Sequence, residues 1–378
     1  MIMRSIQRVC RLTQEVYMTT LEYKPDWEEA KQRWTAWWLG QKLDRAILTV
    51  YAPRDGVGDV EYPPRPLTPL ERWTNLDYLD AVNLYSWRTT FYGAEAFPMW
   101  CPGYPGHVGM PTFYGCPIDL DWDTGWNQAI LTGERLDVSG LKVDRTSYWW
   151  QFGMDIHRRA KASSLGKAIA GMCAIFGGGD TLGMIRGSER LMIDLMDDPK
   201  AVLEAELKFM HEWFKVYQLY ADTVRTGEDW FATWFPTWAP GTYYTAQCDV
   251  GYGISPASFR ECFLPATKMQ VEYLDYSIFH VDGVGMFPFV DDICRLEALD
   301  GLQILPGAGK PSPLHYLDVL QKVQRAGKRL HITIEASEVP QALELLSARG
   351  LCINTSCASE AEARKVIEQV AALSVDRG

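Results

Sequence analysis

Short apolar runs alternate with amphipathic segments along the C-terminal third of the chain. The apolar runs predict strands, and the segments between them, with apolar residues every three or four positions, predict helices. Predicted strands cover 276–280, 301–305, 329–334 and 351–355, and predicted helices cover 290–299, 314–325, 339–348 and 359–373. Strands that alternate with helices at this spacing form parallel βαβ units. The pattern therefore predicts an α/β fold, either a doubly wound sheet or a barrel.

The alternation is less regular upstream. The acidic stretch Asp26-Trp27-Glu28-Glu29 opens a predicted helix that ends near Gly40, and the apolar run from Ala46 to Tyr51 predicts the first strand. Further helices are predicted at 70–87, 141–163, 188–198 and 199–224, and strands at 168–175 and 229–233. No G-x-G-x-x-G fingerprint of a dinucleotide-binding fold appears, so we favour a (β/α)8 TIM barrel over a doubly wound sheet.

Two segments do not fit the barrel pattern. Residues 94–144 hold five prolines among many glycines and aromatics, and we expect them to form a loop-rich insertion over the barrel mouth. Met1 to Thr20 has no clear pattern, and we expect a weakly ordered N-terminal extension there. The remainder, 21–378, is predicted to be one domain, with the helix at 26–40 as a helical extension before the first strand.

Composition and charge narrow the classes of partner. The net charge of −11, from 37 Lys and Arg against 48 Asp and Glu, repels nucleic acid and anionic membranes, so neither is expected to bind. No apolar run approaches the roughly 20 residues that span a bilayer. The nine cysteines include no C-x-x-C pair, which indicates a reduced, cytoplasmic protein. A homodimer is compatible with these features.

Several chemically distinct side chains come at the ends of predicted strands. His280 and Asp282 follow the run that begins at Tyr276, while Glu335, Cys357 and Trp234 end other predicted strands. Because active sites of α/β barrels lie at the carboxyl ends of the strands, these side chains are expected to converge. Imidazole, carboxylate and thiolate are the ligand types of catalytic zinc, so His280, Asp282 and Cys357 are candidate zinc ligands. The alternative is structural, because a single histidine at a strand end is often only hydrogen-bonded and a lone cysteine in an apolar strand is often a small core residue.

The remaining candidate residues allow more than one interpretation. Trp230, Trp234 and Tyr244 are predicted to line a substrate pocket, although aromatics of this density also pack beneath lids. Glu335 is predicted to be catalytic, either as general acid/base, as a further ligand, or as the partner of His331. The glycine cluster from Phe176 to Thr181 has no Gly-Lys-Ser/Thr, so a tight strand-to-helix turn is favoured over a phosphate loop.

A series of motifs resembles, in the same order, the signatures of the uroporphyrinogen decarboxylase superfamily. The motifs are Gly187-Ser188-Glu189, Leu195-Met196-Asp197-Asp198-Pro199, Ile254-Ser255-Pro256, Phe263-Leu264-Pro265 and His280-Val281-Asp282-Gly283. The similarity covers roughly Pro25 to the end and is weakest between Ala94 and Asp144. The resemblance implies a (β/α)8 barrel with a deep cleft at the carboxyl ends of its strands.

Two activities occur in the family that this chain resembles. Its decarboxylases carry an arginine-rich segment after the first strand, but the stretch Tyr51 to Gly56 holds only Arg54. The zinc-dependent methyltransferase branch looks closer, because its pattern is His-x-Cys-Gly followed by a distal Cys. His280 matches the histidine and Cys357 the distal cysteine, 357 − 280 = 77 residues on, while Asp282 replaces the first cysteine.

The resemblance therefore implies methyl transfer between a small methylated substrate, or a thiol such as coenzyme M, and a corrinoid protein. No corrinoid-binding segment is visible, so cobalamin would have to come on a separate protein. Two alternatives remain on the same barrel. One is a metal-free decarboxylase or lyase with Asp282 or Glu335 as proton donor, and the other is a small-molecule binding protein that retains its ligand without turnover.

Overall fold

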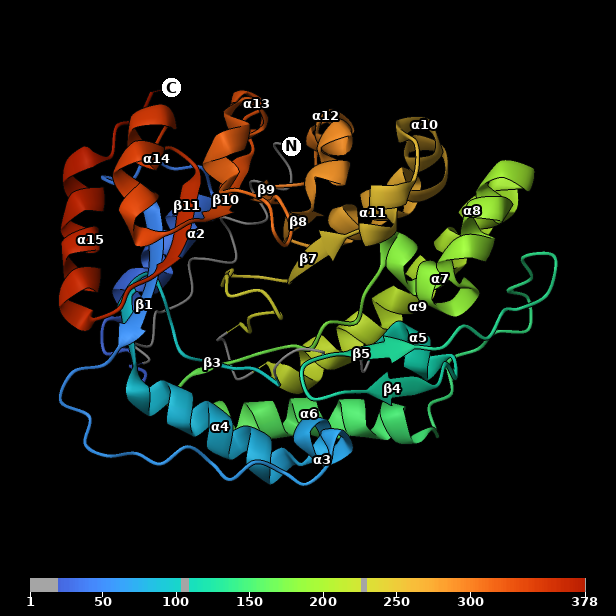
Figure 1. The fold of residues 1–378 in the computed structure, drawn as a ribbon, viewed down its shortest axis with the longest axis horizontal. Helices are drawn as coiled ribbons and strands as arrows, with labels where there is room; N and C mark the ends of the chain where they lie inside the picture. The colour runs from blue at the N-terminus through green and yellow to red at the C-terminus, as the bar shows by residue number, and fades with distance from the viewer. Residues whose placement is uncertain (1–19, 103–108, 226–229, 378) are drawn as a thin grey trace.

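A computed structural model of the chain describes residues 20–102, 109–225 and 230–377. The predicted weakly ordered extension, Met1 to Thr20, lies outside the described residues except for Thr20. The core of the fold is a seven-stranded sheet of order β2-β1-β11-β10-β9-β8-β7, in which β2 alone runs antiparallel to its neighbour (Figure 1). The strands are β1 Ile47–Pro53, β2 Thr90–Ala94, β7 Tyr243–Gln247, β8 Tyr276–Asp282, β9 Gly301–Leu305, β10 Arg329–Thr333 and β11 Leu351–Ser356. The α/β class and all four C-terminal strands are confirmed.

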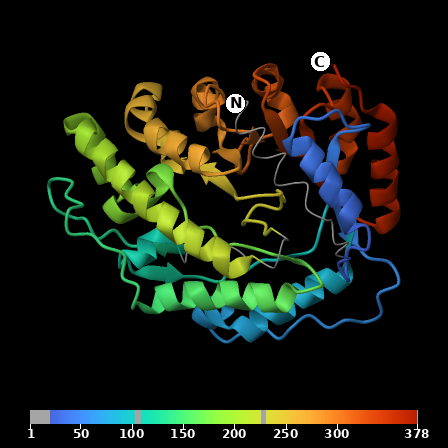
Figure 2. The same cartoon turned by 180° about the vertical axis from the view of Figure 1, so that it is seen from behind.

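Helices surround this sheet in two layers, which meet where α9 packs against α11. Figure 1 shows α11 to α15 along its outer side and α4, α6 and α9 in a second layer, and Figure 2 shows from behind that α9 lies against α6. The helices are α2 Trp27–Trp38, α3 Pro69–Thr74, α4 Leu76–Thr89, α5 Met110–Phe113, α6 Tyr148–Ser164, α7 Gly178–Arg186, α8 Ser188–Asp197, α9 Pro199–Val224, α10 Pro256–Ser258, α11 Leu264–Tyr273, α12 Val290–Cys294, α13 Leu317–Arg325, α14 Val339–Leu345 and α15 Glu360–Leu373. Shorter turns of helix are η1 Asp249–Gly253, η2 Phe259–Phe263, η3 Val284–Phe289, η4 Pro313–Tyr316 and η5 Ala336–Glu338.

The predicted closed barrel is not confirmed, because the strands of the described residues do not pair into one closed ring. Two short pairs stand apart from the main sheet: β3 Met99–Trp100 with β6 Ile169–Ala170, and β4 Ile118–Leu120 with β5 Gly125–Asn127. The strand predicted at 229–233 is reduced to single bridges from Ala232 to Gly171 and to Trp238. Pro236 and Pro240 have no N–H to donate, which limits further pairing of this segment.

The predicted helix at 70–87 is divided at Asn75. This residue ends α3, and its side chain accepts hydrogen bonds from the backbone N–H groups of Asp77 and Tyr78, which begins α4. The predicted insertion at 94–144 contains β3, α5 and the β4–β5 hairpin. Its backbone meets α7, where Ile130 and Leu131 donate to the carbonyl of Ile185. Among the described residues, no helix combines the length and apolar character that crossing a membrane requires.

The two faces of the main sheet pack against different partners. Residues such as Phe279 and Val281 belong to the larger core with the C-terminal helices, whereas their neighbours Tyr276 and Ile278 belong to a second core with α2. We call this second side the inner face. Trp38 of α2 lies with its ring centroid 5.4 Å from that of Tyr243 and 5.3 Å from that of Tyr276. The tryptophans of α2 therefore fill the inner face at the amino ends of the strands, which leaves the carboxyl ends for polar side chains.

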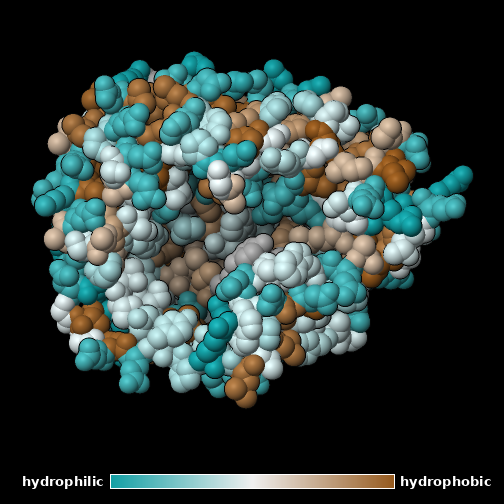
Figure 3. Space-filling view, viewed as in Figure 1, coloured by the Kyte–Doolittle hydropathy of each residue, from teal (hydrophilic) through white to brown (hydrophobic). Residues whose placement is uncertain are grey.

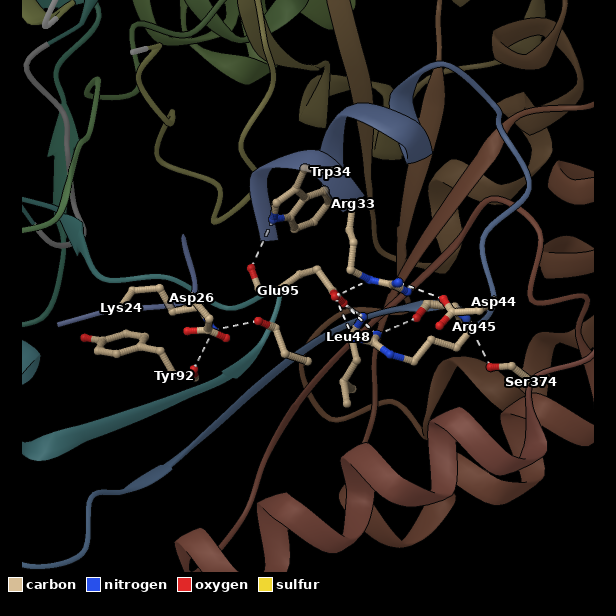
Figure 4. Close-up of polar contacts among 12 residues, drawn as sticks. Lys24, Asp26, Arg33, Trp34, Asp44, Arg45, Leu48, Tyr92, Glu95 and Ser374 are labelled. Carbon is tan, nitrogen blue, oxygen red and sulfur yellow. Dashed lines mark hydrogen bonds and ion pairs between the residues drawn. The ribbon is translucent and has the colours of Figure 1, made fainter. Parts of the chain in front are cut away.

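A buried ionic network joins α2 to the start of β1 (Figure 4). The carboxylate of Glu95, 1% exposed, accepts hydrogen bonds from Arg33 at 2.7 Å, from Arg45 at 2.6 and 2.8 Å, and from the backbone N–H of Leu48 at 2.9 Å. The indole of Trp34 donates to the Glu95 carbonyl. Since a buried carboxylate is tolerated only when it is paired and hydrogen-bonded, this arrangement fixes α2 in one position against the sheet.

Candidate metal centre

Polar side chains form one row across the inner face, close to the carboxyl ends of the strands. The register places Gln247 of β7 beside His280 of β8, His280 beside Gln303 of β9, and Gln303 beside His331 of β10. Side chains two residues apart on a strand share a face, so Asp282 projects from the same side as His280, one step nearer the strand end. The row lies above the aromatic core that α2 fills.

His280, Asp282 and Asp249 form a group that could hold a metal ion. One potential ligand atom from each residue lies within 4.8 Å of the other two, and His280 Nε2 lies 4.0 Å from Asp282 Oδ2. Asp249 comes from η1, directly after β7, which is the strand adjacent to that of His280. The side chain of His280 is 11% exposed and that of Asp282 42%, so the group opens to solvent on the Asp282 side.

The orientation of the His280 ring favours a ligand role. Its Nδ1 is hydrogen-bonded to Oε1 of Gln303, and an amide oxygen can only accept, so Nδ1 carries the proton. The lone pair of Nε2 is then available on the side of the two carboxylates. Histidines that bind metals are held in this way by a second hydrogen bond on the far nitrogen.

Electrostatics also favour a cation in this group. The Asp249 side chain reaches solvent, yet it lies so deep among protein atoms that desolvation, together with the negative charge of the nearby Asp282, raises its pKa to about 7. A divalent cation between the two carboxylates would remove their mutual repulsion. One imidazole and two carboxylates fit zinc with an open fourth position and also suit harder divalent ions.

The structure does not bring Cys357 to this group, so its prediction as a zinc ligand is corrected. Cys352 of β11 lies in the core on the inner face, and Cys357 comes five residues later, directly after the end of the strand. An odd separation turns a strand residue to the opposite face, and Cys357 indeed packs in the larger core on the helix side. Its backbone N–H donates to the carbonyl of Tyr51. The third residue that lies near His280 and Asp282 is Asp249.

Glu335 does not join the group either. It is exposed and begins η5, where its carboxylate caps the backbone N–H of Glu338 while the Glu338 carboxylate accepts from the N–H of Glu335. It is also not the partner of His331, whose ring nitrogens are buried next to Phe235 and have no hydrogen-bond partner among the residues that the structure describes. The local role of Glu335 is therefore a helix cap.

The three aromatics predicted to line a pocket have different positions. Trp234 is beside the metal group, with its ring centroid 5.3 Å from that of His280 at an interplanar angle of 89°. Trp230 stacks under Arg225, and its carbonyl accepts from Trp238. Tyr244 is fully buried on the helix side of β7, where its hydroxyl accepts from the N–H of Ile175, so its prediction as a substrate contact is corrected. Only Trp234 of the three meets the group.

Two residues of the site have no counterpart among the sequence predictions. Asp249 follows Gln247 at the end of β7, and Gln303 lies within the apolar run of β9. The sequence holds a signal for each of them. Asp249 is an acid two residues after a strand, and Gln303 is a lone amide inside a buried strand, which needs a hydrogen-bond partner.

The face in Figure 3 is hollowed at its centre, between the layer of β7 to β9 and that of β3 to β5.

Comparison with solved structures shows that this fold is similar to that of a methyltransferase. The chain is similar to a methyltransferase from Methanosarcina mazei, with a TM-score of 0.61 and 14% sequence identity, over 91% of this chain and 98% of that one. No family model and no curated protein matches the sequence. At this identity the likeness shows that the two chains share a fold.

Proposed function

We propose that this protein is a metal-dependent methyltransferase whose centre is Asp249, His280 and Asp282. The observation that carries the proposal is the convergence of these three potential ligands, with His280 oriented by Gln303, at the carboxyl ends of parallel strands. The similarity in fold to a methyltransferase supports the same class of reaction. Zinc is the ion that we expect in the centre.

The ion would supply one kind of chemistry, lowering the pKa of a bound thiol or polarising the atom that carries the methyl group. Every other part of the mechanism belongs to the chain. Asp249, Asp282 and Nε2 of His280 would hold the ion, and Gln303 would keep the His280 tautomer fixed. Trp234, whose ring stands edge to face with the His280 ring, would form a wall that excludes water from the reacting methyl group.

We further propose that the methyl group moves between a small methylated substrate or a thiol and cobalamin on a separate corrinoid protein. This finer assignment rests on the resemblance of the sequence to the methyltransferase branch. The two carboxylates bring a charge of −2 to the ion, as two thiolates would, and the open position remains for the thiol or methyl donor.

Metal content and methyl transfer test the proposal together. We expect the purified protein to bind about one zinc per chain, and His280→Ala to lose it, because the imidazole is one of three protein ligands. His315→Ala, which removes an exposed histidine on η4, is the matched control and should bind zinc as the wild type does. Methylcobalamin and coenzyme M serve as probes, and methyl transfer is followed by the change in cobalamin absorbance.

The outcomes separate the competing functions. Transfer that stops in His280→Ala and in the presence of a chelator supports the proposal. Absence of metal from the wild type, combined with release of carbon dioxide that chelators do not affect, would instead support a metal-free lyase. Retention of a bound small molecule without turnover would support a binding protein.

A further inference from the structure

The turn from Phe176 to Asp180 has no role in the proposed reaction so far, although its glycines are among the most distinctive features of the sequence. It leads from the segment after β6 into α7, whose first turn contains Asp180. We propose that Asp180 is a positioning residue that holds the backbone of the Asp249 loop, so that the Asp249 carboxylate faces the metal. This inference rests on the proposed function, because it assigns a second layer to the same centre.

One carboxylate binds the chain on both sides of Asp249. Oδ1 of Asp180 accepts from the backbone N–H of Asp249 at 2.6 Å and from that of Val250 at 3.3 Å. Oδ2 accepts from Nε2 of Gln247 at 2.7 Å, and the same nitrogen lies 3.3 Å from Oδ2 of Asp249. Asp180 is only 6% exposed, so these contacts are shielded from water. The carboxylate therefore fixes both the loop backbone and the side chain that touches the Asp249 carboxylate.

The glycines explain how α7 comes close enough for these contacts. A Cβ at Gly179 would lie 2.4 Å from Cγ1 of Val250, and one at Gly178 would lie 2.9 Å from the carbonyl oxygen of Gln247. Gly178 also has φ +50, in the left-handed region that other residues rarely adopt. Any larger residue would push the start of α7 away from the end of β7 and carry Asp180 out of hydrogen-bond reach.

A merely structural role for Asp180 would not select these partners. Glu206 of α9 is equally buried, at 1% exposure, and its carboxylate has no hydrogen-bond partner in the described residues. Both oxygens of Asp180 instead accept hydrogen bonds from the candidate ligand Asp249 or from residues one or two positions away from it, Val250 and Gln247. Residues that orient metal ligands in this way change metal affinity when they are replaced, typically by about 10- to 100-fold.

Zinc affinity of three variants tests the inference, measured on metal-free protein in competition with a chromophoric chelator. Asp180→Ala should bind zinc about 10- to 100-fold more weakly. Asp180→Asn should lose less affinity than Asp180→Ala, because the amide oxygen still accepts from the two backbone N–H groups and only the contact with Nε2 of Gln247 is lost. Glu206→Gln is the matched control and should bind as the wild type does. Equal losses in Asp180→Asn and Asp180→Ala would overturn the positioning role.

Hydrogen exchange of the metal-free protein gives a readout that does not depend on the ion. Asp180→Ala should exchange faster than the wild type in the peptide that contains Asp249 and Val250, and Asp180→Asn should not. Unchanged exchange there would overturn the inference. Should Asp180→Ala not fold, Gly179→Ala offers the same test without altering the carboxylate. If the wild type binds no zinc while Asp180→Ala still exchanges faster, the proposed function fails and the positioning of the loop stands.

Discussion

Replacing Gln303 with leucine should weaken metal binding although Gln303 itself is not a ligand. Oε1 of Gln303 accepts a hydrogen bond from Nδ1–H of His280, and leucine fills a similar volume without an acceptor. The imidazole then loses its fixed tautomer and leaves a buried N–H unpaired, which costs about 1 to 3 kcal/mol. Loss of such a second hydrogen bond typically lowers metal affinity about 10- to 100-fold, or about 1.4 to 2.8 kcal/mol, so the two estimates agree.

The assay is a zinc titration of metal-free protein in competition with a chelator, at fixed pH and salt. Gln303→Glu is the matched variant, since a carboxylate accepts the same hydrogen bond from Nδ1–H of His280 and increases the basicity of the ring. It should bind zinc at least as tightly as the wild type does. Circular dichroism confirms that both variants fold. Zinc binding by Gln303→Leu as tight as that of the wild type would refute the assignment of His280 as an oriented ligand.

Three further predictions concern residues away from that contact. Cys357→Ala should leave zinc affinity unchanged in the chelator assay, because the sulfur packs on the helix side of β11; a tenfold loss would return it to the ligand set. Glu95→Gln should lower the free energy of unfolding in urea by about 3 to 5 kcal/mol, since it removes the buried negative charge that pairs with both Arg33 and Arg45 and leaves, among the described residues, only Asp44 to pair with Arg33; a loss under about 1 kcal/mol would contradict this. Burial lowers the pKa of His157 from 6.5 to about 4, so the unfolded chain takes up a proton at a higher pH than the folded chain does. The free energy of unfolding of the wild type should therefore fall by up to about 3 kcal/mol as the pH falls from 6.5 to about 4. His157→Gln should lack this part of the acid sensitivity in urea unfolding at pH 5 and pH 7, and identical losses in both proteins would contradict it.

The C-terminal part of the fold was predictable because its signals are local. Each strand from β8 to β11 is a short apolar run between amphipathic helices, and the predicted bounds agree with the structure to within a few residues. β7 was missed, because its sequence Tyr-Tyr-Thr-Ala-Gln is buried on both faces and shows no alternation of apolar and polar residues. Closure of a barrel depends on pairing between distant segments, and the segment around Ala232 pairs through single bridges only.

The candidate site was predictable where its residues share one strand. His280 and Asp282 are two apart, so the strand geometry alone puts them on one face. Cys357 could not be placed in the same way. The face on which it lies follows from its odd separation from Cys352, and the sequence alone does not show that Cys352 lies on the inner face. Asp249 was missed together with β7, because a strand-end residue is recognisable only once the strand is known.

In the centre that we propose, oxygen ligands stand where the methyltransferase pattern has sulfur, and this difference changes the softness of the ligands more than their charge. Two carboxylates and a neutral imidazole supply −2, the same charge that two thiolates and an imidazole would supply in the methyltransferase pattern. A divalent ion is therefore neutralised equally well, but the harder oxygen ligands discriminate less against ions such as Mn²⁺. If a thiol is the substrate, its sulfur becomes the one soft ligand of the ion. We therefore infer that preference for zinc over Mn²⁺ depends on the bound substrate more than on the chain itself.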